Sequence, residues 1–323
     1  MIFTAINIKL HGYIKKSSKR FNKLFIKELL KNRYLYLMLA PVLVYFILFS
    51  YLPMYGAQIA FKDFKPGVSV WDSPWAGLKY FHQFFNSYYF GRLIVNTVKL
   101  SVLTLVFCFP APIILALLLN EMKNKLYKSL IQTFSYLPHF ISLVVICGMI
   151  LDFLKPEGLI NRLIITLGLS QESISFMTSP GWFRSIYVIS EIWQNAGWAS
   201  IIYLAALTGI DNYLYEAAII DGANRWRQLW NITLPGITPT IVILLIMNIG
   251  LIMSVGGDKV ILLYNPSIYE TADVISSFVY RRGIKDASFS FASAVGLFNS
   301  AINFIILILA NKISKKLTES SLW

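Results

Sequence analysis

The stretch YLYLMLAPVLVYFILFSYLPMY, residues 34–55, contains no charged side chain. A helix needs about 20 predominantly apolar residues to cross the hydrocarbon core of a bilayer, which is about 30 Å thick. Residues 34–55 therefore predict a membrane-spanning helix. Lys31 and Arg33 precede it directly, and basic residues gather at the cytoplasmic end of such helices.

Further apolar stretches along the chain meet the same criterion. Together they predict six spans, at residues 34–55, 93–119, 129–153, 181–207, 239–264 and 291–311. Of the 323 residues, 56% are hydrophobic and 14% are charged, whereas a soluble domain carries roughly 25% charged residues. Composition and spans predict an all-α integral membrane protein and argue against a soluble enzyme.

The positions of the 29 Lys and Arg residues predict the orientation of these spans. Seventeen lie before the first span, after the last one, or in the second-to-third and fourth-to-fifth connections, and nine lie in the other three loops. By the positive-inside rule both termini are cytoplasmic, and loops 56–92, 154–180 and 265–290 are outside. The formal net charge of +13 therefore reports topology rather than an acidic substrate or a nucleic acid.

The chain divides into three parts on this basis. Residues 1–33 form a basic segment, residues 34–311 form the six-span domain, and residues 312–323 form a cytoplasmic tail. Apolar and basic residues interleave up to Arg33, a pattern typical of an amphipathic helix on the inner leaflet. A solvated basic tail is the alternative.

Residue types that carry catalysis or bind metals are scarce. The two cysteines, Cys108 and Cys147, lie inside apolar runs, and the chain has three histidines. We expect neither a disulfide framework, nor a metal site, nor catalytic residues. A GxxxxGK[ST] motif is absent from the sequence, so any ATP hydrolysis that depends on this motif would belong to another chain.

The polar stretch DNYLYEAAIIDGANRWRQLWNITLPGITP, residues 211–239, separates the fourth and fifth predicted spans. Asp211 is a typical N-cap residue, and the residues after it are compatible with a helix. Gly222 is expected to break this helix. Apolar residues recur at helical spacing from Trp226, and we expect Pro235 to end the second helix. The stretch predicts two short helices with a glycine bend.

Two roles are open for this helix pair on physical grounds. Its Ala217-Ala218 face allows close approach by a partner protein, with a flanking acid and two arginines to fix the register. Alternatively, the pair is an amphipathic loop that rests on the bilayer surface, because basic amphipathic segments serve both purposes.

The same loop resembles a known motif. Glu216-Ala217-Ala218, three residues, Gly222, nine residues and Ile232-Thr233-Leu234-Pro235 match in full the EAA loop, EAA-x3-G-x9-I-x-LP, of binding-protein-dependent ABC importer permeases. Longer stretches resemble the LplB-like group of oligosaccharide permeases, namely SYLPHFIS (135–142), WFRSIYVISEIWQNAGWASIIYLAALTGID (182–211), LLYNPSIYETADVIS (262–276) and the final SLW. The resemblance covers nearly everything after about Lys31.

This resemblance implies one permease subunit of a type I ABC importer in a bacterial cytoplasmic membrane. Its partners would be a second, different permease chain, two ATPase subunits and an extracellular or lipid-anchored solute-binding protein, with an oligosaccharide as substrate and no nucleic acid. The chain would bind no cofactor, because ATP and Mg would be held by the ATPases. The implied ATPase-coupling residues are Glu216, Ala217, Ala218, Asp221, Gly222, Ala223, Arg225, Trp226, Ile232, Leu234 and Pro235.

Polar and aromatic residues within the spans are candidates for the substrate pathway, because charged groups facing lipid cost about 2.5 to 3.5 kcal/mol. In the fourth span, Glu191, Asn195 and Trp198 share one helix face, and Trp193 lies between them. Contacts between spans would explain these residues as well as a pore lining does.

Three further candidates lie near helix-breaking residues. His139 follows Pro138, which disturbs the third span; packing explains this histidine as well as a proton relay does. Asn248, and Asp258 directly after the Gly256-Gly257 pair, indicate that the fifth span is broken or polar near its outer end. An ordinary helix terminus explains Asp258 equally well.

Alternative functions follow from other interpretations of the same residues. The EAA motif is shared by importers of non-carbohydrate solutes. Glu191 and His139 would serve as acid and base in a membrane-embedded enzyme, although no nucleophile or metal-ligand cluster accompanies them. A passive channel would leave the Ala-Ala loop without a role.

Overall fold

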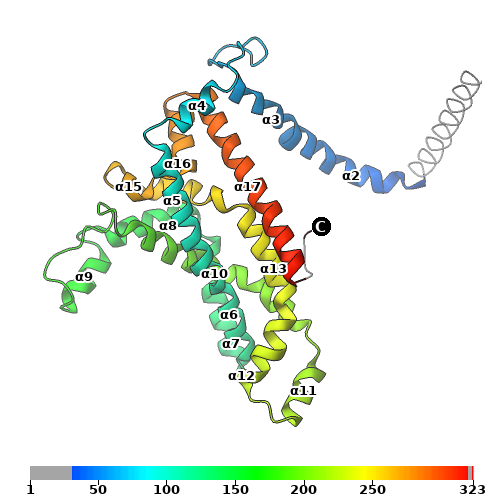
Figure 1. Ribbon diagram of the computed structural model, residues 1–323. Helices are drawn as coiled ribbons and strands as arrows, with labels where there is room; N and C mark the ends of the chain where they lie inside the picture. The colour runs from blue at the N-terminus through cyan, green and yellow to red at the C-terminus, as the bar shows by residue number, and fades with distance from the viewer. Residues whose placement is uncertain (1–30, 319–321, 323) are drawn as a thin grey trace, which may run out of the picture. The chain divides into compact units, whose positions relative to one another are not determined.

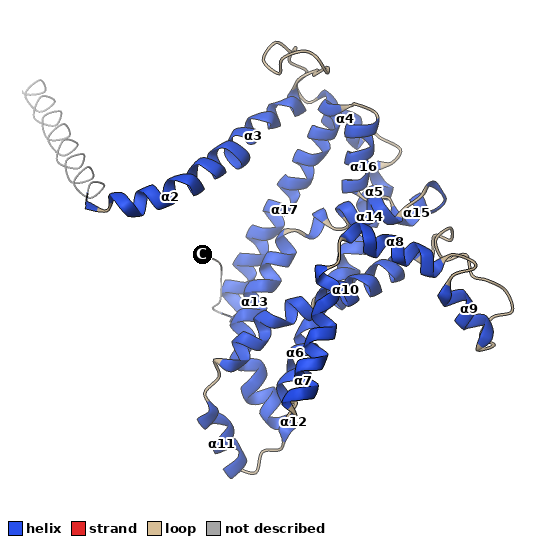
Figure 2. Ribbon diagram, turned by 180° about the vertical axis from the view of Figure 1, so that it is seen from behind, coloured by secondary structure: helices blue, strands red, loops and turns tan. Residues whose placement is uncertain are grey.

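The computed structural model describes residues 31–318 and 322. The expected amphipathic N-terminal helix therefore lies outside the described residues, apart from its last three. The chain forms two compact units, Met1–Gln58 and Ile59–Trp323. The described part is helical and contains no β-strand (Figure 2), which confirms the all-α class there.

The first unit contains a single long helix in its described part. It comprises α2 (Arg33–Phe46), a π-helical turn (Ile47–Tyr51) and α3 (Leu52–Met54). The 3₁₀ segment that follows, Tyr55–Phe61, continues into the second unit. This helix is long and apolar enough to cross a membrane. It agrees with the first predicted span, 34–55.

The first half of the second unit holds α4 to α9. Phe90 begins a long helix made of α5 (Phe90–Leu103), a π-helical turn (Thr104–Cys108) and α6 (Pro110–Glu121). The shorter helices are α4 (Lys79–Phe85), α7 (Lys125–Tyr136), α8 (Leu143–Leu154) and α9 (Leu159–Thr166). A 3₁₀ turn (Leu137–Phe140) joins α7 to α8.

The second half holds α10 to α17. The long elements are α10 (Phe183–Thr208), α13 (Leu234–Gly250) and α17 (Phe289–Thr318). The short helices are α11 (Asn212–Ile220), α12 (Arg225–Gln228), α14 (Gly257–Leu263), α15 (Tyr269–Ala272) and α16 (Ile275–Tyr280).

Four helices in the described residues are long and apolar enough to span a membrane, namely Arg33–Phe61, Phe90–Glu121, Arg225–Gly250 and Phe289–Lys316. The pair Lys125–Phe140 and Leu143–Thr166, bent by 100°, is a fifth candidate. Helix α10 has 26 residues, about 39 Å of helix, and is not among these candidates.

Two predicted spans need correction. The third, 129–153, is not one helix, because it bends sharply at the 3₁₀ turn that contains Pro138. The fifth, 239–264, is also not one helix: it begins earlier, at Arg225, and its long segment ends at Gly250. The breaks themselves lie where proline and the Gly256-Gly257 pair predicted them.

Helix α10 is the central element of the second unit. It packs against α6, α7 and α13, while α17 packs against α13, α4 and α16 (Figure 1). The contact between α10 and α7 is very close, since a Cβ at Gly197 would lie 1.9 Å from the Ser135 carbonyl oxygen. Both views place α11 and α12 at one end of this unit and α4 and α16 at the other (Figures 1 and 2).

Candidate functional site

Helix α11 begins and ends where the sequence predicts. The Asp211 carboxylate accepts a hydrogen bond from the Tyr213 N–H at 3.0 Å, as an N-cap residue does. Gly222 has φ +74°. The N–H groups of Gly222 and Ala223 donate to the carbonyls of Ile219 and Ala218, which is the Schellman pattern that ends a helix. Asp211 and Gly222 thus fix the length of α11 by local interactions alone.

The surface of α11 is open. It has no buried residue, and Tyr213, Ile219 and Ile220 are 76%, 62% and 86% exposed. Among the described residues, the carboxylates of Glu216 and Asp221 have no hydrogen-bond or ion-pair partner. Such an exposed apolar surface with free charges at its edge is typical of a protein interaction site.

The following segment differs from the prediction. We expected Pro235 to end the second short helix, and this was wrong: the helix that starts at Arg225 continues through Pro235 to Gly250. Proline crowds the carbonyl four residues before it. The turn Leu229–Thr233 is π-helical and therefore wider, and Pro235 lies in the first turn of α13, where it is tolerated.

Side-chain contacts hold this loop against neighbouring elements. Tyr215 on α11 hydrogen-bonds Thr233 at 3.0 Å. Arg225 forms an exposed ion pair with Glu121, at the end of α6, at 3.3 Å. Trp226 is 70% exposed, whereas Ala223, Ile232 and Leu234 are half-buried. The structure therefore gathers the eleven coupling candidates in one region. The exposed ones are Glu216, Ala217, Asp221, Gly222, Arg225, Trp226 and Pro235, whereas Ala218 is half-buried.

A cavity of about 400 Å³ lies between α5, α10 and α13 and the break after α13; its wall is largely apolar but carries several polar side chains, and we call it the polar cavity. Its walls include Glu191 and Asn195, as predicted for the substrate pathway, and Asn248. Ser101, Thr104 and Ser254 contribute hydroxyl groups. Cavities of this size, with a few placed polar groups, are typical ligand sites.

A series of polar contacts through α10 links the 3₁₀ turn between α7 and α8 to helix α14. The His139 Nδ1 lies 3.0 Å from Asn195 Oδ1, and because this oxygen only accepts, His139 donates. The Asn195 Nδ2 donates to Glu191 Oε1 at 2.6 Å, and Lys259 Nζ donates to Glu191 Oε2 at 2.8 Å. His139 also stacks on Trp198, with ring centroids 4.9 Å apart.

The remaining substrate candidates lie apart from this chain of contacts. Trp193 lines a separate apolar cavity of about 470 Å³ between α8 and α10. Asp258 is exposed in the first turn of α14 and is not among the residues around the polar cavity. Asn248 lines the cavity, and its Nδ2 donates to the Leu244 carbonyl.

Sequence reasoning missed the partner of Glu191. Lys259 is 4% exposed, donates to Gln194 as well as Glu191, and lies 5.4 Å from the Tyr187 ring centre. An unpaired ammonium in an apolar span is costly, so a lysine there signals an acidic partner. The sequence does not show which acid, because 68 residues separate Lys259 from Glu191.

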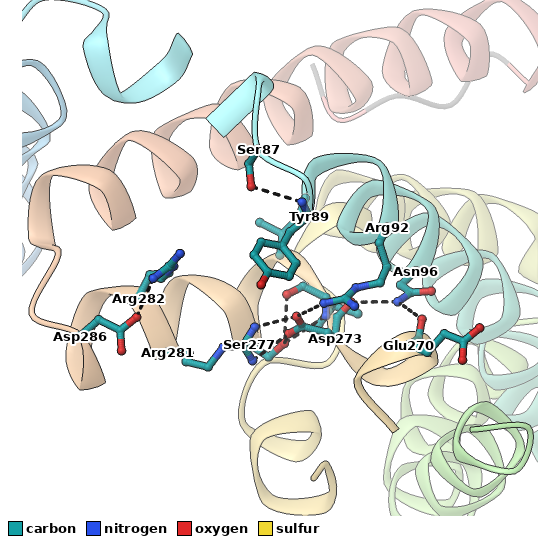
Figure 3. A network of polar contacts seen from close by, with 12 residues as sticks. Ser87, Tyr89, Arg92, Asn96, Glu270, Asp273, Ser277, Arg281, Arg282 and Asp286 are labelled. Atoms are coloured by element: carbon teal, nitrogen blue, oxygen red, sulfur yellow. Dashed lines mark hydrogen bonds and ion pairs between the residues drawn. The ribbon is translucent and has the colours of Figure 1, made fainter. Parts of the chain in front are cut away.

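A second buried ionic cluster holds the segment beyond the break in place (Figure 3). Asp273 is fully buried and accepts from Arg281 at 2.7 Å and from Arg92 at 3.4 Å. Ser277 donates to the same carboxylate, while Asn96 donates to the Asp273 carbonyl. The irregular chain after α14 is thereby fixed to α5 and α16.

The loop after the first long helix carries a further charged contact. Tyr80 donates to the Asp63 carboxylate at 2.5 Å, and Lys79 donates to it at 3.3 Å. The hydrogen bonds from Tyr80 and then Lys79 lower the pKa of Asp63 below its ordinary value. Asp63 is therefore ionised over the whole physiological pH range.

Comparison with known proteins decides the family. Residues 109–319 match the family described as the inner-membrane component of binding-protein-dependent transport systems. The chain belongs to this family. A transport protein of the bacterial inner membrane, rather than an enzyme, is therefore confirmed.

Individual relatives match nearly the whole chain. Protein LplB of Bacillus subtilis is 45% identical over 300 residues, which cover 93% of this chain and 94% of LplB. The polygalacturonan/rhamnogalacturonan transport system permease protein YteP of the same organism is 45% identical over 309 residues, or 95% of each chain. A chain of a bacterial alginate ABC transporter, solved in complex with an alginate pentasaccharide-bound periplasmic protein, has a TM-score of 0.84 and 43% identity, covering 92% of this permease and 99% of that chain.

Proposed function

We propose that this permease forms half of the translocation pore of an ATP-driven importer that receives oligosaccharides from a solute-binding protein. The observation that carries the proposal is the exposed helix α11, whose unpaired Glu216 and apolar side chains project from a permease fold. The carbohydrate class follows from YteP, which is named for glycan transport, and from the alginate importer.

Coupling to ATP is assigned to the loop that contains α11 and α12. ATP and Mg would be held by two ATPase subunits, each permease chain docking one of them through its EAA loop. In this chain the surface offered is Glu216 to Gly222 together with Trp226. Closure of the ATPases would move these loops and rock the spans as rigid bodies between inward- and outward-facing states.

We also propose six spans and cytoplasmic termini, because the loops predicted to lie on the same side of the membrane contact one another. Loops 56–92, 154–180 and 265–290 contact one another, since Phe64 N–H donates to Ser290 and Thr271 donates to the Pro180 carbonyl. The connections on the other side meet through the Arg225–Glu121 pair. This grouping supports a crossing by the bent pair α7–α8 and by α10.

The substrate pathway is assigned to the polar cavity beside Glu191 and Asn195. His139, which stacks on Trp198, donates to Asn195 and holds it in position. Trp193 and Asp258, which lie elsewhere, are not included. Irregular backbone inside a membrane is tolerated where it lines such a cavity, and the break after Gly250 does so.

The proposal is tested by purifying the permease from its native membrane and identifying the proteins that accompany it. We expect a second permease and an ATPase, with ATP hydrolysis stimulated by solute-binding protein loaded with one glycan of a panel. A permease that purifies alone, or an ATPase that responds to a non-carbohydrate solute, would contradict it.

A further inference from the structure

We propose that the Glu191–Lys259 ion pair sets the charge of the cavity wall. As a result, this half of the pathway binds the hydroxyl groups of a sugar and offers no cation to bind a uronate carboxylate. The inference rests on the proposed function and adds the kind of sugar group that this site accepts. It also assigns Lys259, which lies outside the cavity lining, a role in specificity.

The cavity presents hydrogen-bonding groups but no cation. Of the described residues that line it, Glu191 is the single charged one. The side chain of Asn248 uses its Nδ2 on the Leu244 carbonyl, which leaves its Oδ1 to accept from a ligand. Carboxylate and amide oxygens suit hydroxyl donors, whereas an anionic group needs a cation or several N–H donors.

Lys259 does not supply that cation. Its side chain is 5% exposed, against 25% for Glu191, and Glu191 lines the cavity whereas Lys259 does not. The ammonium already donates to Glu191 and to Gln194 and lies over Tyr187. Lys259 thus neutralises Glu191 from behind without offering a donor to a ligand.

This arrangement predicts what happens when either charge is removed. Replacing Glu191 by Gln leaves the Lys259 charge uncompensated beside the cavity, which favours an anionic ligand. Replacing both residues by Gln restores a neutral wall. Because a buried charge without its partner is costly, the double variant should also assemble better than the single one.

The experiment measures the affinity of the purified transporter complex in lipid nanodiscs, without solute-binding protein, for two probes. These are tetragalacturonate and its fully methyl-esterified form, which share one backbone and differ in charge. Calorimetric titration gives the ratio of the two dissociation constants for each variant. Co-purification of the partner subunits serves as the folding control.

We expect E191Q to shift this ratio toward the acid by about tenfold, which corresponds to about 1.4 kcal/mol. E191Q/K259Q should return the ratio to within about twofold of the unaltered protein. D152N is the matched control, since it removes the same charge from an exposed residue whose partner is Lys155; its ratio should not move.

A further variant covers the case in which E191Q does not assemble. N248K adds a cation to the cavity wall without breaking the buried pair, and it should shift the ratio in the same direction, whereas N248Q should not. An unchanged ratio in E191Q or N248K, an equal shift in the double variant, or no binding of either probe would overturn the inference. The proposed function would survive each of these results if glycan-loaded binding protein still stimulates the ATPase.

Discussion

Gly222 shows how one residue shapes the coupling loop. Its φ of +74° lies in the left-handed region, while a Cβ there would meet no atom within 4 Å. Contacts within this chain therefore do not limit the size of a side chain at residue 222. The left-handed backbone conformation does limit which residue types fit there. The left-handed region costs most residues about 1–2 kcal/mol, with Asn penalised less.

We predict that G222V impairs coupling more than G222N does. Valine, which is β-branched, disfavours the conformation that ends α11, so Glu216 and its neighbours would lose their fixed position. Glycan-stimulated ATP hydrolysis in the assembled transporter should fall by about tenfold for G222V, corresponding to about 1.4 kcal/mol, and by less for G222N. Equal losses would show that side-chain bulk at the ATPase contact matters instead.

Gly197 is constrained by space rather than by conformation. A Cβ there would lie 1.9 Å from the Ser135 carbonyl oxygen, whereas a Cβ at Gly296 in α17 would meet nothing within 4 Å. We predict that G197A destabilises the protein by about 1–3 kcal/mol, the usual cost of overpacking. G296A should be neutral or slightly stabilising, because Ala is the better helix former. Thermal melting followed by size-exclusion chromatography checks this pair, and equal melting temperatures would contradict the close approach of α7 and α10.

At the scale of elements, what the sequence could predict was local. Apolar length located the first, second and sixth spans. Asp211 and Gly222 bounded α11, and Pro138 and Gly256 marked the breaks. The 100° bend, the continuation through Pro235 and the pairing of Glu191 with Lys259 depend on neighbours distant in sequence. For these features a single sequence shows which residue types are present but does not show which residues they contact.

The Asp273 cluster illustrates such a long-range pairing, since Arg92 lies 181 residues away. We predict that D273N costs about 3–5 kcal/mol, because it leaves Arg281 and Arg92 without their buried counter-charge (Figure 3). D286N is the matched control: Asp286 pairs with Arg282 at 3.0 Å, but both side chains are over 40% exposed, and such pairs contribute about 0–1 kcal/mol. Loss of assembled complex on heating measures both, and equal losses would remove the anchoring role of Asp273.

At the scale of the whole molecule, two topologies differ in whether the bent pair α7–α8 crosses the membrane. A pair bent by 100° is also compatible with a re-entrant segment that returns to its starting side. In a crossing, Lys123 and Ser173 lie on opposite sides, while in a re-entrant segment they lie on the same side. The contact of Thr271 with the Pro180 carbonyl links the chain after α9 to the segment beyond the break, and this favours a crossing.

Single cysteines introduced after removal of Cys108 and Cys147 decide between these topologies. We predict that V68C and S173C react with a membrane-impermeant maleimide in intact cells, whereas K123C and R227C react only after lysis, as the distribution of basic residues requires. All four positions are exposed within this chain, so a failure to react reports the membrane barrier rather than burial in the permease. Labelling of S173C only after lysis, together with K123C, would make α7–α8 a re-entrant pair and reduce the number of spans.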